Sequence, residues 1–379
     1  MSTAIHTILA VGDLVLDEQE VGHYFDATRE IFHAADLAIA QIEVPHTTST
    51  ECASVDVPAP PAPVHNVAEI ARAGFGVATL AGNHIYDCGP QGIRDTIELA
   101  AAAGIRTTGA GENLEAARRP VITELGERRV GLLNYNCVGP RESWATSKKA
   151  GCAFVKVLTH YELDSANPGG PPSVYSFAEP ASYEAFTADV RALAAEVDVV
   201  IVALHKGIGH LPAEIAAYET QLAHAAIDNG AHAVIAHHAH IMRGIEFYRG
   251  APVFHGLGNF VTVTNALSAG GDNTSPERLA WAKRRKKLFG FEPDPTMPNY
   301  AFHPESRNTA IAVLEIDGAG ALEASFIPCW IDQSAAPQPL RDEASAAPVL
   351  AYVESISREA GFGTRFTWDT DRVRVAPPA

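Results

Sequence analysis

Polar side chains that can bind metal follow five short apolar runs of the sequence, which are ILAVG, LAIAQI, VATLAG, VVIVAL and AVIA. These side chains are Asp13, Glu43, Asn83, His205, His238 and His240. Taken singly, each has an ordinary structural explanation as a helix cap or a hydrogen-bonded core residue. Together they form a mixed carboxylate, amide and imidazole set, which suits Mn²⁺, Zn²⁺ or Fe²⁺ better than Ca²⁺ and lacks the thiolates of structural zinc sites. The pattern predicts a catalytic divalent-cation site.

The elements that must position these residues alternate between strand and helix. Apolar, β-branched runs predict strands at 7–12, 36–42, 75–82, 197–204 and 231–236. Helical spacing predicts helices at 64–74, 90–104, 182–197 and 213–230. This alternation is typical of an α/β fold, in which ligands bind at the carboxyl ends of the strands. We therefore expect the six side chains to converge.

The domain organisation predicted from the sequence is one catalytic domain over residues 1–335. Two long segments, about 139–181 and 264–307, interrupt the alternation and are expected to be functional loop insertions or lids. Residues 336–379 are expected to form a linker and a helix at about 347–360 that packs on the domain.

The composition limits the classes of partner. The chain has 379 residues, 47% of them apolar, and a formal net charge of −17, which opposes binding to nucleic acid or an anionic membrane. No signal-like start and no apolar stretch of roughly 20 residues is present in the sequence, so we predict no membrane span and a cytoplasmic location. The 5 cysteines form no C-x-x-C pair and are expected to be reduced thiols. A homo-oligomer is compatible with the sequence.

Seven ordered segments resemble the CapA family, named for poly-γ-glutamate capsule synthesis, whose catalytic domain is similar to calcineurin-type metallophosphatases. The segments are AVGDLVL, IAQIEVP, LAGNHIYDCGPQGI, TTGAGENLEAARRP, VALHKG, GAHAVIAHHAH and GLGNFV, between residues 10 and 261. The resemblance implies a metallophosphatase-like sandwich of two mixed β-sheets flanked by helices, with long loop insertions.

The same resemblance implies a role for each ligand. Glu43 would bridge two cations; Asp13 and His240 would hold one of them, and Asn83, His205 and His238 the other. The sequence departs from the phosphatase pattern at Val15, where that motif carries a histidine, so the number of cations is left open. His84 would be the general acid that protonates the leaving group, and Asp87 would orient it or serve only as a turn residue.

Four cationic residues are candidates for contacting a substrate carboxylate or phosphate: Lys206, Arg94, Arg141 and Arg307. For Arg141 and Arg307, an ordinary surface charge is the favoured interpretation. No Gly-x-Ser-x-Gly motif or Cys/His dyad points to an enzyme nucleophile, so a metal-activated water is expected to attack.

The resemblance favours hydrolysis of an amide or γ-glutamyl-type bond in a small-molecule or short peptide-like anionic substrate. A phosphoesterase using the same metals is the first alternative. A non-catalytic protein that binds or assembles poly-γ-glutamate is the second.

Overall fold

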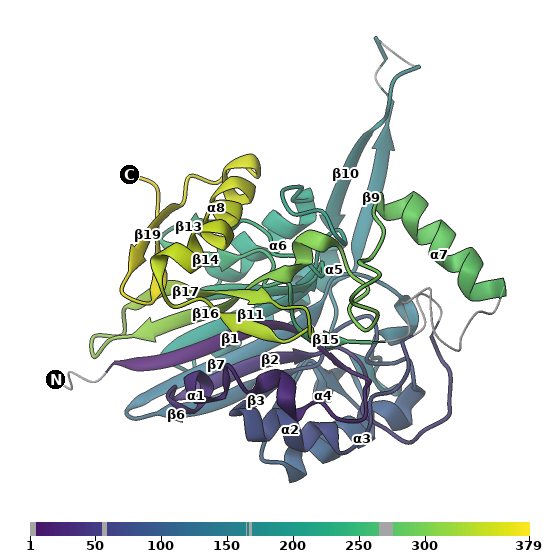
Figure 1. Cartoon of the computed structure of the whole chain (residues 1–379), viewed down its shortest axis with the longest axis horizontal. Helices are drawn as coiled ribbons and strands as arrows, with labels where there is room; N and C mark the ends of the chain where they lie inside the picture. Colours follow the sequence, from purple (N-terminus) through teal and green to yellow (C-terminus); the bar gives the residue numbers. More distant parts are fainter. Residues whose placement is uncertain (1–4, 55–58, 164, 167–168, 265–275) are drawn as a thin grey trace.

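Two β-sheets face each other in the computed structural model, which describes residues 5–54, 59–163, 165–166, 169–264 and 276–379 (Figure 1). The ten-stranded first sheet contains β1 (His6–Leu16), β2 (Leu37–Ile42), β3 (Val77–Thr79), β4 (Arg106–Thr108), β15 (Asn259–Val263), β16 (Asn308–Ile316), β17 (Leu322–Ile331), β18 (Pro337–Pro339), β19 (Arg365–Asp369) and β20 (Arg372–Ala376). The six-stranded second sheet contains β6 (Val121–Leu125), β7 (Arg128–Asn136), β11 (Val199–Lys206), β12 (Ala233–His238), β13 (Ile245–Tyr248) and β14 (Ala251–Phe254).

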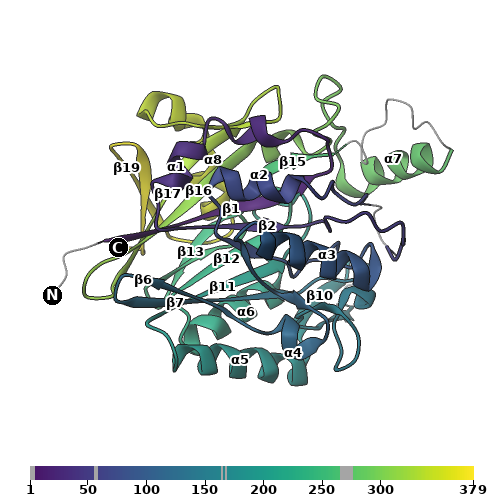
Figure 2. The same cartoon turned by 90° about the horizontal axis from the view of Figure 1, so that it is seen from below.

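Helices cover the outer faces of the two sheets, as Figure 2 shows. One side carries α1 (Arg29–His33), α2 (Asn66–Ala73) and α3 (Gly89–Ala102), and the other carries α4 (Leu114–Ala117), α5 (Pro180–Ala194) and α6 (Ala217–Asp228). A buried apolar cluster that includes Ile8, Ile39, Ile201 and Ile235 fills the space between the sheets. The predicted α/β sandwich of two mixed sheets flanked by helices is therefore confirmed.

The strands that lead to the site run parallel within each sheet. β1 pairs in parallel with β2 and with β15, and β11 pairs in parallel with β7 and β12. The strands are buried along nearly their whole length, which explains why their sequences are continuous apolar runs rather than alternating ones. All five strands and four helices predicted from the sequence are present, with shifted boundaries.

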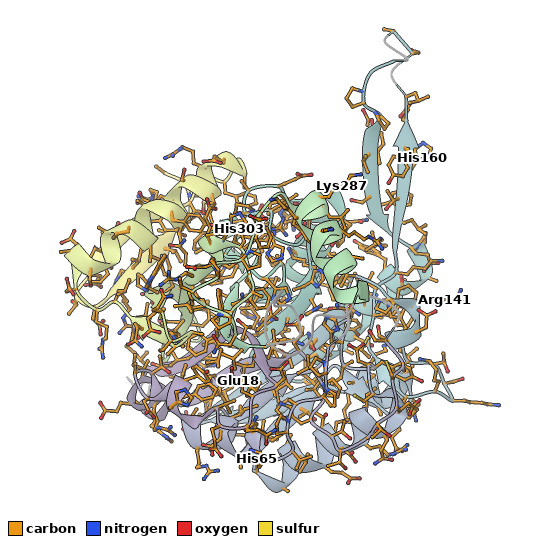
Figure 3. The ribbon with its side chains drawn as sticks, turned by 45° about the vertical axis from the view of Figure 1, so that its right-hand side comes forward. Glu18, His65, Arg141, His160, Lys287 and His303 are labelled. Carbon is orange, nitrogen blue, oxygen red and sulfur yellow. The ribbon has the colours of Figure 1, made fainter. Side chains whose placement is uncertain are left out.

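The two predicted loop insertions contain regular structure. The first holds η2 (Arg141–Ser143), β8 (Gly151–Cys152), which pairs with β5 (Ala110–Gly111), and a hairpin of β9 (Val157–Glu162) and β10 (Ser173–Ala178). This hairpin stands away from the body of the molecule, and His160 lies on it (Figure 3). The second holds α7 (Pro276–Phe289) and η3 (Pro304–Arg307), while residues 265–275 lie outside the described part of the chain.

The C-terminal segment contributes more than the expected linker and helix. Its helix, α8 (Glu343–Glu359), buries Val353 and Ile356 against the core between the sheets. β18 and β20 both pair with β17, and β19 pairs with β20, so this segment extends the first sheet. Outside this segment, the structure also has a short 3-10 helix, η1 (Gly22–Phe25), between β1 and α1. Across those same residues, every helix is too short or too polar to cross a bilayer.

Candidate metal centre

The six predicted ligands come from five strands, and all except Asp13 lie at or beyond the carboxyl end of their strand. Asp13 lies in β1, Glu43 directly follows β2, and Asn83 lies beyond β3. His205 is the penultimate residue of β11, and His238 ends β12, with His240 two residues further on. The structure thus brings together side chains from both sheets that are far apart in the sequence.

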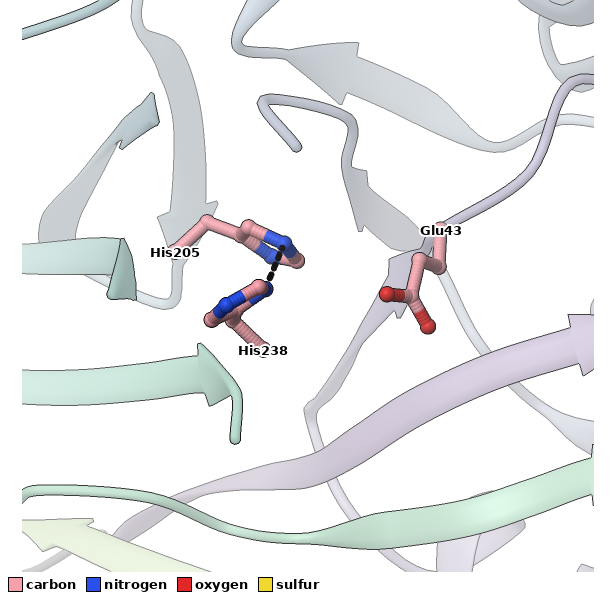
Figure 4. A group of neighbouring side chains, drawn as sticks. All are labelled: Glu43, His205 and His238. Atoms are coloured by element: carbon pink, nitrogen blue, oxygen red, sulfur yellow. Dashed lines mark hydrogen bonds between the residues drawn. The ribbon is translucent and has the colours of Figure 1, made fainter. Parts of the chain in front are cut away.

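Ligand atoms of these residues form two groups, in each of which all atoms lie within 4.8 Å of one another. One group is Glu43, His205 and His238, and the other is Asp13, Glu43 and His240. Figure 4 shows the Glu43 carboxylate facing the two imidazoles of the first group. Within the described part of the chain, Glu43 alone belongs to both groups, so its position suits a bridging carboxylate.

Several ligand atoms are buried without a hydrogen bond of good geometry. In the part of the chain that the structure describes, these atoms include Oδ1 of Asp13 and both carboxylate oxygens of Glu43. The Nε2 atom of His240 approaches Oε1 of Glu43 to 3.3 Å, and Nε2 of His205 lies 2.8 Å from Oδ1 of Asn83. Buried polar atoms are rarely left unsatisfied in native proteins, so this cluster of lone pairs fits a bound cation.

The pKa values of the two carboxyl groups are shifted in opposite directions. Burial, with the neighbouring Glu43 charge, raises the pKa of Asp13 well above its ordinary value. Burial also opposes ionisation of Glu43, but the adjacent His240 outweighs it and the pKa of Glu43 is lowered. Although burial alone would lower it, the pKa of His240 rises to about 9 because Glu43 and Asp13 favour the imidazolium. Without a cation, His240 therefore supplies the positive charge that this acidic pocket requires.

The other two imidazoles are held neutral. Burial lowers the pKa of His205 well below its ordinary value, and neighbouring His238 lowers it further. Burial likewise lowers the pKa of His238 to about 4, with a contribution from His240. Their rings lie close together, with Nδ1 of His238 3.2 Å from Nε2 of His205. A metal ligand must be a neutral imidazole, so both rings are in the protonation state that binding requires.

The backbone around the ligands is held in unusual conformations. His238 and His240 have φ angles of 93° and 54°, a region that costs non-glycine residues on the order of 1–3 kcal/mol each. A Cβ on Gly12 would overlap the Gly258 carbonyl oxygen, which accepts the Asp13 N–H at 2.9 Å. Only glycine at position 12 lets β1 approach this loop and bring Asp13 to the site.

The predicted acid and its orienting residue are in contact. Nδ1 of His84 lies 2.7 Å from Oδ2 of Asp87, and both side chains are buried. The charge of His84 contributes to lowering the pKa of Asp13 and of Glu43, after the larger effects of burial and of His240. The geometry therefore suits a proton donor beside the candidate cation site, and this role remains a prediction.

One residue that the sequence reasoning did not single out supports His240. Oδ1 of Asn259 lies 2.8 Å from Nδ1 of His240, and Nδ2 of Asn259 donates to the Tyr300 hydroxyl at 3.0 Å. The Tyr300 hydroxyl donates in turn to the Ser306 carbonyl at 2.8 Å. This series of hydrogen bonds holds the His240 ring with Nε2 toward Glu43. Asn259 lies in the GLGNFV segment, whose family resemblance was the signal in the sequence that could have identified this residue.

Lys206 does not occupy the predicted substrate position. Successive residues of a strand point to opposite faces, so Lys206 points away from the side on which His205 lies. Its ammonium group is fully buried and contacts Glu219 at 2.9 Å and Nδ1 of His255 at 3.0 Å. The prediction that Lys206 contacts substrate is therefore corrected, and a structural role replaces it.

The three predicted arginines have local contacts. Arg94 donates to Gln91 on its own helix at 2.9 Å, and Arg141 is exposed at the start of η2 (Figure 3). Arg307 lies over the Trp330 ring, 4.5 Å from its centroid, and donates to the Ile331 carbonyl. These contacts give no evidence for a substrate role, which stays a prediction for all three.

The position where the phosphatase pattern has a histidine is apolar here. Val15 is 7% exposed and packs in a small cluster with Val44 and Ala62. It therefore supplies no ligand to either group. Among the His, Cys, Asp and Glu side chains of the described residues, the group on the Asp13 side consists of Asp13, Glu43 and His240.

A family model described as Bacterial capsule synthesis protein PGA_cap matches residues 7–264. A probable polyglutamine synthesis accessory protein of Mycobacterium tuberculosis is 33% identical over 195 residues, covering 49% of this chain and 44% of that protein. The PGA biosynthesis protein CapA of Bacillus subtilis is 25% identical over 256 residues, covering 65% and 58%. The chain thus spans about half the length of the curated relatives it matches.

Two solved structures overlap this chain with low TM-scores. A hypothetical protein from Thermus thermophilus is 15% identical with a TM-score of 0.45, covering 85% of this chain and 99% of that one. The calcineurin-like phosphoesterase YfkN from Bacillus subtilis is 13% identical with a TM-score of 0.39, covering 94% and 98%. We draw no functional conclusion from overlaps this low.

Proposed function

Because this chain belongs to the Bacterial capsule synthesis protein PGA_cap family, we propose that it is a metal-dependent hydrolase of an amide or γ-glutamyl-type bond. The substrate would be a small or short peptide-like molecule that bears carboxylates. The choice of bond follows the names of the relatives, which refer to polyglutamine synthesis and PGA biosynthesis. The choice of metal-dependent chemistry follows the site itself.

The observation that carries the proposal is the shared position of Glu43. Its carboxylate belongs to both ligand groups, and both of its buried oxygens lack a well-formed hydrogen bond from any residue that the structure describes. Glu43, Asp13 and His240 would hold one divalent cation, and Glu43, His205, His238 and Asn83 the other. Two such ions, Mn²⁺, Zn²⁺ or Fe²⁺, would polarise the scissile bond and lower the pKa of the attacking water.

His84 and Asp87 would supply the proton that the leaving group needs. With Nδ1–H of His84 donating to Asp87, Nε2 is the ring nitrogen that gives a proton to the departing amine or alcohol. The Asp87 carboxylate would stabilise the protonated ring before transfer and hold its orientation afterwards. A hydrolase needs such a donor because an amine or alkoxide leaves poorly without protonation.

The experiment compares two substrates on protein loaded with Mn²⁺ or Zn²⁺, against a chelator-treated sample. We expect hydrolysis of γ-glutamyl p-nitroanilide that depends on metal and falls in the H84N variant. Hydrolysis confined to p-nitrophenyl phosphate would replace the amide assignment with a phosphoesterase. Absence of turnover with both substrates, together with less than one equivalent of bound metal, would contradict the hydrolase proposal and favour a polymer-binding role.

A further inference from the structure

A fully buried group of charged residues lies behind the ligand-bearing strands. This ionic cluster consists of Lys206, Glu219 and Arg243, whose side chains have no exposed area. Lys206 Nζ donates to Oε2 of Glu219 at 2.9 Å, and the Arg243 guanidinium donates to the same oxygen. Burial of two cations with one carboxylate is costly unless further partners satisfy the remaining donors.

The remaining donors of Arg243 bind backbone carbonyls of one loop. Nε donates to the Leu211 carbonyl at 3.1 Å, and Nη2 donates to the Glu214 carbonyl. This loop, residues 207–214, directly follows the strand that carries His205. Arg243 thus joins the ionic cluster to the backbone next to the candidate metal centre.

The loop is bonded in turn to the backbone between two metal-ligand candidates. The His210 N–H donates to the Ala239 carbonyl at 2.8 Å, and Ala239 lies between His238 and His240. Hydrogen bonds at both ends of the loop backbone therefore link Arg243 to the backbone that carries both imidazoles.

Four backbone residues in and around this path are in the left-handed region. The φ angles are 61° at His210, 93° at His238 and 54° at His240, and 111° at Gly207. Non-glycine residues keep such conformations only where the surroundings enforce them. A Cβ on Gly207 would overlap Nη1 of Arg243, so the guanidinium packs directly against the start of the loop.

We propose that Arg243 is a positioning residue for the cation site. Held by Glu219, its guanidinium fixes the loop 207–214, and the loop fixes His238 and His240 in the conformation that binds metal. Lysine could keep the charge pair with Glu219, but its single ammonium cannot reproduce the planar set of donors that meets both loop carbonyls. The inference rests on the proposed function only in that the site binds divalent cations.

The test is isothermal titration calorimetry, in which Mn²⁺ is added to the metal-free R243K variant. We expect affinity to fall roughly 10- to 100-fold, the usual effect of losing a group that orients metal ligands. Hydrogen exchange should show faster exchange of the His210 amide. The matched control is R118K, because Arg118 also joins a carboxylate, Asp189, to a backbone carbonyl, Ala185, and none of these residues is a ligand candidate. R118K should bind Mn²⁺ as the unmodified chain does.

The outcomes separate the two proposals. If the unmodified chain binds no Mn²⁺, the proposed function fails. If it binds Mn²⁺ and R243K binds with the same affinity, Arg243 has no positioning role. Should R243K fail to fold, the G207A variant, which displaces the guanidinium without removing it, is titrated instead, and unchanged affinity there would equally overturn the inference.

Discussion

Replacing Glu43 with glutamine should remove more metal-dependent stability than replacing any other ligand. Glu43 belongs to both ligand groups, whereas Asp13 and His205 each belong to one. A ligand at 100 times its Kd stabilises the folded state by about 2.7 kcal/mol per independent site, or about 5 kcal/mol for two. We therefore expect E43Q to lose most of about 5 kcal/mol, and D13N or H205N about half of it.

The assay is thermal unfolding with saturating Mn²⁺ and with EDTA, and the quantity compared is the difference in Tm between the two conditions for each variant. Subtracting the EDTA value removes the effect of each substitution on the metal-free protein, including loss of the contact between Glu43 and His240. With roughly 2 °C per kcal/mol for a large domain, the unmodified chain should gain about 10 °C from metal and E43Q almost none.

The matched control is E246Q. Glu246 also contacts two imidazoles, those of His224 at 2.7 Å and His255 at 2.8 Å, but it belongs to neither ligand group. E246Q should keep the whole gain in Tm. A gain in E43Q equal to that of H205N would refute the bridging position of Glu43, since the two ions would then not share it.

Three further predictions concern the residues around the ligands. H84N should bind metal normally but turn over about 10²–10⁴-fold more slowly, and unchanged kcat would exclude His84 as the proton donor. N259A should weaken Mn²⁺ binding roughly 10- to 100-fold in calorimetry by freeing the His240 ring, and equal affinity would show that Asn259 has no orienting role. Burial opposes ionisation of Glu219, but the charges of Lys206 and Arg243 outweigh burial and lower the pKa of Glu219 from 4.5 to about 2. The ionised Glu219 carboxylate therefore stabilises the fold above pH 4.5, and this stabilisation is lost as the pH falls through 2. E219Q should therefore have a free energy of unfolding about 3–5 kcal/mol lower than the unmodified chain at neutral pH. In chemical unfolding, this difference should shrink between pH 4.5 and 2, and a difference that stays constant would contradict the prediction.

The strand-end residues were predictable because buried parallel strands have a plain sequence pattern. The apolar runs before Glu43, His205 and His238 each correspond to a strand, and the carboxyl ends of such strands meet at one edge. The alternation of side chains along β11 also predicts that Lys206 cannot share the side of His205. The structure agrees with this alternation, since the Lys206 ammonium is buried against Glu219.

Other features depend on contacts between distant segments, which one sequence does not reveal. The contact between Asn259 and Tyr300, and that between Arg243 and the loop 207–214, arise only when separate strands are packed. The β9–β10 hairpin was predicted as loop because its two strands flank a stretch rich in proline, glycine and polar residues. β19 and β20 are also short; β20 joins the first sheet by pairing with β17, and β19 pairs only with β20 among the described strands.

Anomalous diffraction at the manganese edge, from crystals of the full chain grown with Mn²⁺, tests the central claim most directly. The account predicts two peaks about 3.5–4 Å apart, with the Glu43 carboxylate between them, Asp13 and His240 beside one, and His205 and His238 beside the other. Two empty positions at saturating Mn²⁺, or peaks bound only by residues outside this set, would contradict it.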